Sequence, residues 1–318
     1  MQKSILIIFI LFAILVSGYY FFANTPNPGA GPERFIVPRD RGADVSALLK
    51  EQGFVRSAWI TKLFLSVKSG DTTPGGYKLS KGMNAWEIAG VLTQAPYMRW
   101  VTIPEGLRKE ETAEVLGASL MWQEAQSNDF LNAYKTIGAQ YREGYYFPET
   151  YLIPTDEDGA VVAKRMIDKF NENFSPYYAM FLKENIKEGT AIKIASLIER
   201  EAAGHNDMPL VAGIIWNRLL QNMKLDIDAT LQYAQGKVGD LWWAPIHGPD
   251  ARKLESPYNT YLHKGLPPTA ISNPGSAAIE AALHPAKTDC LYYLHDKTGQ
   301  IHCTKTYPEH QRNIQLYL

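Results

Sequence analysis

The sequence predicts an α+β protein with three parts: an N-terminal transmembrane helix, a small β/α subdomain and a larger α+β domain that ends in a β-hairpin. Three observations predict this organisation. Residues 4–23 are apolar and carry no charge, and residues 34–96 alternate between short strand-like and helix-like patterns. Residues 97–318 contain several amphipathic helical patterns and close with two short strand-like segments around a turn. A chain of 318 residues has room for two or three domains.

The apolar run Ser4–Ala23 would span about 30 Å as a helix, which matches the hydrocarbon core of a bilayer. A cleaved secretory signal has a shorter apolar region and a small-residue cleavage site, which this run lacks. Lys3 precedes the run, so the positive-inside rule places the N-terminus in the cytoplasm. We therefore expect residues 1–23 to be a single-pass anchor in the cell (inner) membrane, with the lipid bilayer contacting residues 4–23. The remainder would be periplasmic or otherwise extracytoplasmic.

Residues 24–33 are rich in Pro and Gly and are expected to form a spacer. The subdomain that follows, residues 34–96, is expected to have the element order β-α-α-β-α. Its expected elements are a strand at 35–38, helices at 45–52 and 57–69, a strand at 75–80 and a helix at 83–92. This arrangement resembles a LysM-like subdomain, the kind that binds cell-wall glycans. A role as a spacer or packing domain is the alternative.

Residues 97–318 begin with an expected strand, and helical spacing of apolar residues then recurs along the domain. The strand is expected at 99–104, and the helices at 109–120, 159–173, 190–203, 209–220 and 277–283. Between the first two helices, the aromatic segment 143–150 is expected to form a packed strand-turn corner, with a substrate platform as the alternative. Residues 225–234 are expected to be extended, which would put Asp226 and Asp228 on one side.

One helix contains the candidate catalytic residue. In the segment 190–203, Ile194, Leu197 and Ile198 recur at the spacing of one apolar face, and Glu201 is the next residue on that face. Glu199 lies nearly opposite, at about 100° of rotation per residue. A carboxyl group on an apolar face loses hydration, so its pKa rises and it can hold a proton near neutral pH. The pattern therefore indicates a general acid, although a structural ion pair would give the same pattern.

Composition excludes several other classes of function. The 32 basic and 33 acidic residues nearly cancel, so there is no nucleic-acid footprint and no nucleic-acid partner is expected. The seven His residues lack the spacing of a zinc site, so no metal is expected. No phosphate-binding Gly loop or nucleophilic-serine motif occurs, and no cofactor is expected.

The end of the chain reads as a hairpin with strands at 290–295 and 300–305 around the turn 296–299. Cys290 and Cys303, the only cysteines, flank that turn. In an oxidising compartment they could form a cross-strand bridge, but antiparallel pairing could also leave them diagonal to each other. Both states, a disulfide and two free thiols, are compatible with the sequence.

Taken together, these segments resemble the MltG-type (YceG-like) endolytic murein transglycosylases. The resemblance covers nearly the whole chain. Its motifs are EGYYFPETY, ASLIEREA, NRL, LDIDATLQYA, SPYNTY, GLPPTAISNPG and AALHPAKT, at residues 143–151, 195–202, 217–219, 225–234, 256–261, 265–275 and 281–288. The family's catalytic Glu is the second Glu of an E-x-E, which falls on Glu201. Many members carry Thr or Ser at the next position, where this chain has Ala202.

The resemblance implies non-hydrolytic cleavage of the β-1,4 bond between N-acetylmuramic acid and N-acetylglucosamine inside nascent peptidoglycan strands. Such cleavage leaves a 1,6-anhydro end and terminates glycan elongation. It also implies an α+β catalytic domain at 97–318, peptidoglycan strands as substrate and peptidoglycan synthases as candidate partners. The candidate substrate-binding residues, all within or beside the motifs, are Asn217, Arg218, Asp228, Thr230, Tyr258, Asn259, Tyr261 and Asn273.

Two alternatives remain open. A muramidase-type hydrolase would need a second carboxylate, and Asp226 or Asp228 could supply it. A catalytically silent peptidoglycan-binding scaffold would use the LysM-like subdomain and the aromatic loops, but it would have no need for an acid on an apolar helix face.

Overall fold

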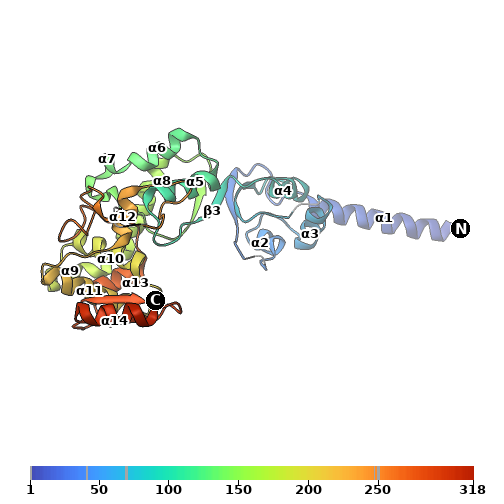
Figure 1. Cartoon of the computed structure of the whole chain (residues 1–318). Coiled ribbons are helices and arrows are strands. Elements are labelled where there is room, and N and C mark those ends of the chain that lie inside the picture. The colour runs from blue at the N-terminus through green and yellow to red at the C-terminus, as the bar shows by residue number, and fades with distance from the viewer. Residues whose placement is uncertain (1, 41, 69–70, 247, 249–250) are drawn as a thin grey trace. The chain divides into compact units, whose positions relative to one another are not determined.

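The computed structural model describes residues 2–40, 42–68, 71–246, 248 and 251–318, and Figure 1 shows the order of its elements. The chain forms two compact units. Unit 1 comprises Met1–Val101 together with Thr150–Glu157, and unit 2 comprises Thr102–Glu149 and Asp158–Leu318. The later segment joins unit 1 because it supplies the last strand of that unit's sheet.

The first element is the helix α1, Gln2–Ala23 (Figure 1). Its described side chains are those of residues 7–18, and the apolar ones among residues 7–17 are exposed. Within the part of the chain that the structure describes, no helix has both the length and the apolar character needed to cross a membrane.

Unit 1 contains a four-stranded sheet in the order β1-β2-β3-β4. The strands are β1 Pro32–Val37, β2 Gly75–Ser80, β3 Met98–Thr102 and β4 Thr150–Pro154. β1 and β2 pair antiparallel with Phe35 opposite Tyr77. The element order β-α-α-β-α that the sequence predicts is present from β1 to α4. β4 was not predicted, because the aromatic corner expected from the sequence ends at Thr150, where β4 begins.

Unit 1 has three further helices, α2 Val45–Glu51, α3 Ala58–Val67 and α4 Ala85–Leu92. α4 packs against β2 and α3, and α3 packs against α2. Side-chain caps fix where they begin. Asp44 accepts from the first-turn amides of α2, and Asn84 does the same for α4, where Glu87 completes a capping box. The core of the unit is formed by aromatic and aliphatic side chains such as Phe35, Leu49, Phe54, Tyr77 and Ile88.

Unit 2 is mainly helical. Its helices are α5 Lys109–Leu120, α6 Glu124–Asn132, α7 Tyr134–Ile137, α8 Gly159–Phe174, α9 Tyr178–Glu184, α10 Glu188–Glu201, α11 Met208–Leu220, α12 Asp228–Gln235, α13 Ser276–Leu283 and α14 Tyr307–Tyr317. Short 3₁₀ turns lie at Ala139–Arg142, Ser175–Tyr177 and Ala251–Lys253, and the strands are β5 Tyr292–His295 and β6 Ile301–Thr304.

The helices predicted from apolar spacing are present, and each end lies within two residues of its predicted position. Ser69, the predicted end of the helix that begins at residue 57, lies outside the described residues. Residues 225–234 are not extended throughout, and that prediction was wrong. α12 begins at Asp228, because Ala229, Thr230 and Leu231 bury one side of a helical turn. The corner expected at 143–150 is packed, since Tyr145, Tyr146 and Phe147 are buried, but it contains no strand before Thr150.

α10 lies at the centre of unit 2 and packs against α11, α12 and α13 (Figure 1). Ile194, Leu197 and Ile198 are fully buried, as their spacing predicts. The Ala-rich face of α13 contributes small side chains, and α10 and α13 can therefore approach each other closely. The apolar stripe therefore fixes the direction of α10 and the position of its last residue, Glu201.

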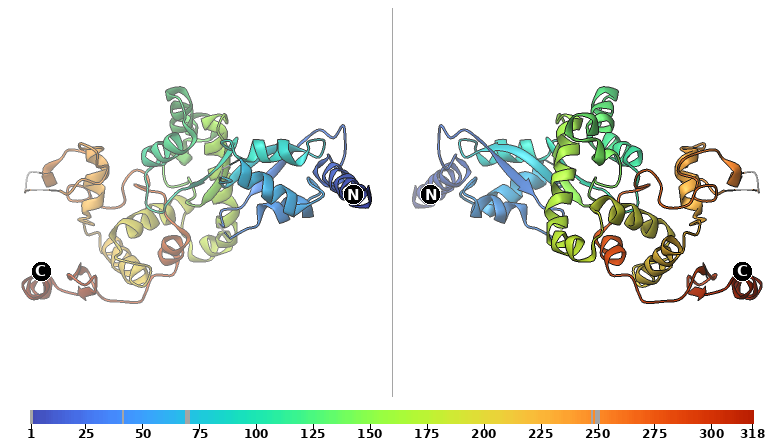
Figure 2. Two further views of the ribbon diagram at one scale, coloured as in Figure 1. Left: turned by 90° about the vertical axis from the view of Figure 1, so that its right-hand side faces the viewer. Right: turned by 90° about the vertical axis from the view of Figure 1, so that its left-hand side faces the viewer.

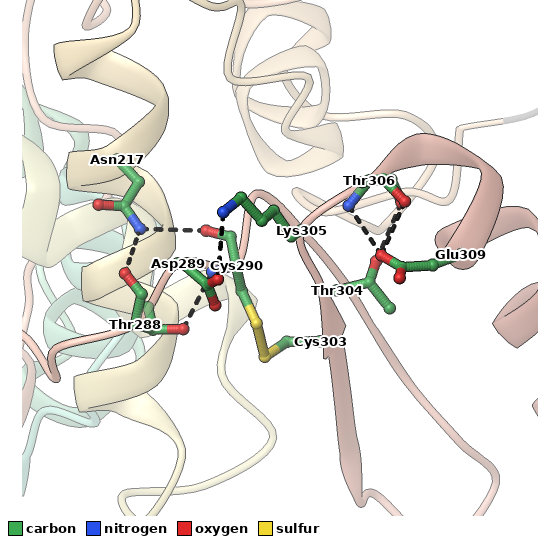
Figure 3. Close-up of a disulfide and its surroundings, with 9 residues drawn as sticks. All are labelled: Asn217, Thr288, Asp289, Cys290, Cys303, Thr304, Lys305, Thr306 and Glu309. Atoms are coloured by element: carbon green, nitrogen blue, oxygen red, sulfur yellow. Dashed lines mark hydrogen bonds and ion pairs between the residues drawn. A yellow bond between two sulfur atoms is a disulfide. The ribbon is translucent and has the colours of Figure 1, made fainter.

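The C-terminal part is the β5–β6 hairpin with α14 packed beside it, drawn in dark red in both views of Figure 2. Tyr293 pairs with Cys303, so Cys290 lies diagonal to Cys303. The two cysteines nevertheless form a disulfide, with their Cα atoms 5.8 Å apart (Figure 3). α14 was not predicted from the sequence. No side chain of this helix is buried, so it has no apolar stripe, and its clearest signal is the capping box of Thr306 and Glu309.

Replacing both cysteines, Cys290→Ser with Cys303→Ser, should lower stability. The bridge spans 13 residues, and in the chain-entropy picture a loop of this size is worth about 2 to 3 kcal/mol. We expect a lower midpoint of thermal unfolding, followed by circular dichroism, and earlier loss of hydrogen-exchange protection in β5 and β6. Unchanged unfolding of the double variant would show that the bridge does not stabilise the hairpin.

Candidate active site

The site is centred on Glu201, the last residue of α10. Its Oε2 accepts a hydrogen bond from the Tyr293 hydroxyl of β5 at 2.6 Å. The residue is partly exposed, so its carboxyl lies at the boundary between the core and the surface. This placement follows from the pattern of α10, because Glu201 continues the face of the buried Leu197 and Ile198.

Loss of hydration raises the pKa of the Glu201 carboxyl above its ordinary value. The hydrogen bond from Tyr293 acts in the opposite direction and lowers that pKa. The negative charge of Asp228 raises it, and the neighbouring His295 and Arg200 lower it. Burial is the largest of these contributions, so the carboxyl holds its proton at a higher pH than an exposed glutamate does.

A second contact joins β5 to the chain that follows α10. The His295 Nε2 lies 2.6 Å from Oδ2 of Asp207. The Asp207 carboxylate also accepts from the backbone amides of Ala203 and Gly204, at 3.1 and 3.2 Å. The turn after Glu201 is therefore held from both sides, by its own Asp207 and by the strand.

Asp228 begins α12, and its Oδ1 accepts from the hydroxyl of Tyr261 at 2.6 Å. Two of the residues predicted to bind substrate are thus hydrogen-bonded to each other near Glu201. Asp226 has a left-handed backbone, with φ of 52°, and its carboxylate faces Arg218 at 3.5 Å. The two aspartates therefore lie in different environments, one at the helix start and one in a turn beside an arginine.

Glu199 has a separate role in the structure. Its Oε2 accepts from the Gly275 amide at 3.0 Å, on the far side of α10 from Glu201 as the helical rotation predicts. Burial raises its pKa, too. The Glu199 carboxyl holds the start of α13, since Gly275 is the residue before that helix.

Asn217 and Arg218 donate hydrogen bonds to the segment that leads into β5. Asn217 Nδ2 donates to the carbonyl oxygens of Thr288 and Cys290 at 2.9 and 3.1 Å (Figure 3). Arg218 Nε donates to the Leu291 carbonyl at 2.6 Å, and its Nη1 donates to the loop before α12. These contacts give both residues a structural role, and their binding to sugar stays a prediction.

Thr230, Tyr258 and Asn259 hold the loops around α12 together. Thr230 is fully buried, with its Oγ1 3.0 Å from that of Thr260. The Asn259 amide, also fully buried, donates to two backbone carbonyls of the preceding loop. The Tyr258 hydroxyl is 2.8 Å from Thr269 Oγ1. Of these three residues, only Tyr258 is partly exposed.

Asn273 is fully buried and connects two segments that are distant in sequence. Its Oδ1 accepts from the backbone amides of Gly144 and Tyr146, at 3.1 and 3.0 Å. Its Nδ2 donates to the Leu107 carbonyl at 2.9 Å and to Glu143 Oε1 at 3.3 Å. A side chain with all these bonds inside the protein serves the fold, and direct contact with substrate stays a prediction.

Glu143 is a second buried carboxyl in unit 2, only 1% exposed. It accepts from the Lys109 amide at 3.0 Å, from the Tyr233 hydroxyl at 3.2 Å and from Asn273. Burial raises its pKa to about 8 despite these donors. This carboxyl connects the start of α5, the aromatic corner and α12, and its burial places it away from solvent and from any polysaccharide.

The raised pKa of Glu143 makes stability depend on pH. The folded protein keeps this proton up to about pH 8, whereas the unfolded chain loses it near 4.5. Stability from this group should therefore fall as pH rises between these values, by at most about 1.4 kcal/mol per pH unit. Glu143→Gln preserves the shape and the three contacts, because Nε2 can donate to the Tyr233 hydroxyl. Between pH 5 and 8, the thermal midpoint of the Glu143→Gln variant should fall less steeply with pH than that of wild type. Identical pH dependence in the two proteins would show that Glu143 does not keep its proton in the folded state.

Among the described residues, no three His, Cys, Asp or Glu side chains lie together as a metal site would require.

Sequence reasoning missed Tyr293, His295 and Asp207. Tyr293 and His295 alternate in β5 and so share one face of the strand. That alternation was visible, but the sequence does not show that this face meets the end of α10, because Tyr293 is 92 residues away from Glu201.

The chain is similar to several known proteins. The model of the YceG-like family matches residues 35–316. A protein named endolytic murein transglycosylase from Bacillus subtilis (strain 168) is 31% identical over 305 residues, which cover 87% of this chain and 83% of the relative.

A protein with the same name from Streptococcus pneumoniae serotype 2 is 28% identical over 98% of this chain, which spans 65% of that relative's length. The crystal structure of a yceG-like protein from Listeria monocytogenes is also similar. It superposes with a TM-score of 0.62 at 27% identity, over 89% of this chain and 99% of that one.

Proposed function

The chain belongs to the YceG-like family, and from this premise we propose that it is a lytic transglycosylase that cleaves peptidoglycan strands internally. The proposed substrate bond joins N-acetylmuramic acid to N-acetylglucosamine. The observation that carries the proposal is the position of Glu201: an acid at the end of a buried helix face, partly desolvated and held by one hydroxyl. The names of the similar proteins support the choice of substrate.

In the proposed reaction, the protonated Glu201 donates its proton to the glycosidic oxygen as the bond from the muramic acid C1 to that oxygen breaks. The 6-hydroxyl of the same muramic acid attacks C1, and the Glu201 carboxylate removes the proton of that hydroxyl. One ring closes, one glycosidic bond is lost and the carboxyl regains its proton, so no water is consumed. Because the nucleophile belongs to the substrate, the attack is intramolecular and its entropic cost is low.

A raised pKa suits the first step, because the acid must carry its proton when the glycosidic bond begins to break. A hydrolase would instead need a second carboxylate and a bound water. Asp226 and Asp228 are the candidates, but they are engaged by Arg218 and Tyr261, respectively. These contacts favour the transglycosylase, in which a single acid serves twice.

The products test this proposal. Incubation of purified protein with peptidoglycan strands should release fragments with 1,6-anhydromuramic ends, each one water lighter than the corresponding reducing end, as measured by mass spectrometry. Fragments with reducing ends alone would identify a hydrolase. If no cleavage occurs while glycan still binds, the scaffold alternative is favoured.

The proposal includes anchoring to the cell membrane through α1, with the N-terminus in the cytoplasm and units 1 and 2 outside. Exposed apolar side chains along α1 and the position of Lys3 support this arrangement. The Cys290–Cys303 bridge supports an oxidising, extracytoplasmic compartment. Deleting residues 1–24 should release the protein from the membrane fraction of cells, and continued sedimentation with membranes would exclude anchoring by this segment.

The LysM-like subdomain, residues 34–96, is proposed to hold the glycan, and its element order supports that role. Peptidoglycan synthases remain candidate partners.

A further inference from the structure

Strand β5 presents two side chains to the end of α10. Tyr293 and His295 alternate along the strand and so lie on the same face. Tyr293 donates to Glu201 Oε2 at 2.6 Å, and His295 contacts Asp207 at 2.6 Å. The Tyr293 contact holds the Glu201 carboxyl itself. The His295 contact holds the Asp207 carboxylate, which accepts from the backbone amides of the turn after Glu201.

The geometry leaves one carboxyl oxygen of Glu201 available. Tyr293 engages Oε2, whereas Oε1 receives no hydrogen bond from the described residues. Ala202, the residue that follows Glu201, offers no hydroxyl to this carboxyl. The hydroxyl that contacts the carboxyl in this chain comes instead from a strand 92 residues further on.

Tyr293 can only act as a donor to this carboxyl at working pH. Burial and the nearby Glu201 raise the pKa of its hydroxyl well above the ordinary value, so the phenol stays protonated. A phenol that donates to an ionised carboxylate forms a charge-assisted bond, which is stronger than its bond to the neutral acid. Tyr293 therefore has the chemistry to fix one oxygen and to stabilise the carboxylate that forms in mid-reaction.

We propose that Tyr293 is the positioning residue for Glu201: it holds Oε2 so that Oε1 faces the scissile bond, and it stabilises the carboxylate after the first proton transfer. This inference rests on the proposed transglycosylase function. It also makes the C-terminal hairpin part of the active site, because the disulfide-closed β5–β6 pair carries the hydroxyl.

The proposal predicts a directional change in the pH profile. The form of the free enzyme that starts the reaction has protonated Glu201, so kcat/KM should fall on the alkaline side as this group ionises. The other charged groups near it are Asp228 on α12, His295 on β5 and Arg200 on α10. Because the Tyr293 bond favours ionisation, its removal should move the alkaline limb to higher pH.

The test uses the full chain with Tyr293→Phe and with 3-fluorotyrosine at position 293. Phenylalanine removes the hydroxyl and keeps the ring, so we expect kcat to fall by about 10- to 100-fold and the alkaline limb to move to higher pH. The fluorinated phenol is a stronger donor, and it should move the limb to lower pH. The matched control is Tyr292→Phe, since the neighbouring Tyr292 packs its ring against Tyr307 and His310 instead.

The outcomes separate this inference from the proposed function. If wild type makes no anhydro-ended products, the function itself is wrong. If wild type is active and both position-293 variants keep its alkaline limb, Tyr293 does not position Glu201, whatever happens to the rate. Opposite shifts in the two variants, with the Tyr292→Phe profile unchanged, support the proposal. Because 3-fluorotyrosine has nearly the shape of tyrosine, this arm remains informative if the phenylalanine variant folds poorly.

Discussion

Glu201→Gln should abolish cleavage of peptidoglycan, with a loss of at least about 10³-fold in kcat, because the same group is expected to transfer a proton in both halves of the reaction. Glutamine has nearly the same shape, and its oxygen can still accept from the Tyr293 hydroxyl. Folding and glycan binding should therefore be retained. Anhydro-ended products, quantified by mass spectrometry against wild type, provide the measurement.

Glu199→Gln is the matched control, because it makes the same chemical change two residues away on the same helix. The Gln oxygen can still accept from the Gly275 amide, so this variant should keep most of the wild-type rate. Comparable losses in both variants would show that charge around α10, not the Glu201 carboxyl, is what activity requires. A fully active Glu201→Gln variant would rule out Glu201 as the acid.

Asn273→Ala should cause the second large effect, a loss of roughly 3 to 5 kcal/mol in the free energy of unfolding. It would leave the buried amides of Gly144 and Tyr146 without their acceptor. The Leu107 carbonyl and the Glu143 carboxyl would each lose one donor, but they keep the backbone amides of residue 273 and of Lys109, respectively. Each buried group that loses its hydrogen bond costs about 1 to 3 kcal/mol. Urea unfolding, followed by tryptophan fluorescence, measures the change.

The matched control for this prediction is Asn132→Ala. Asn132 is exposed at the end of α6, and its amide makes one local bond to the Asn128 carbonyl. We expect a change within about 0.5 kcal/mol, as is usual for surface positions. If the two variants unfold alike, the buried contacts of Asn273 do not carry the stability assigned to them.

The parts of the fold that sequence could predict are those with a repeating pattern. Ile194, Leu197 and Ile198 are buried as their spacing indicates, and the same spacing placed Glu201 at the end of that face. The hairpin was predicted from two short segments around a turn. α14 was missed because a helix without buried side chains leaves no stripe in the sequence.

The site was harder to predict because a polar residue can either bind substrate or hold the protein's own loops together, and the sequence does not distinguish these two roles. Asn217, Asn259 and Asn273 lie in motifs of the resemblance, yet each donates to backbone carbonyls inside the protein. Which carbonyls need a donor depends on loops that come together only in the folded chain. For the same reason, the partner of Glu201 could not be read from its own helix: Tyr293 is brought to it by the packing of the hairpin.

In the proposed reaction the nucleophile is the sugar's own hydroxyl, and one acid serves both steps. Digestion in water enriched in heavy oxygen distinguishes this reaction from hydrolysis. The new muramic ends released by wild type should be anhydro ends without heavy oxygen. Heavy oxygen at C1 of the newly formed ends would show that water attacked and that the enzyme is a hydrolase.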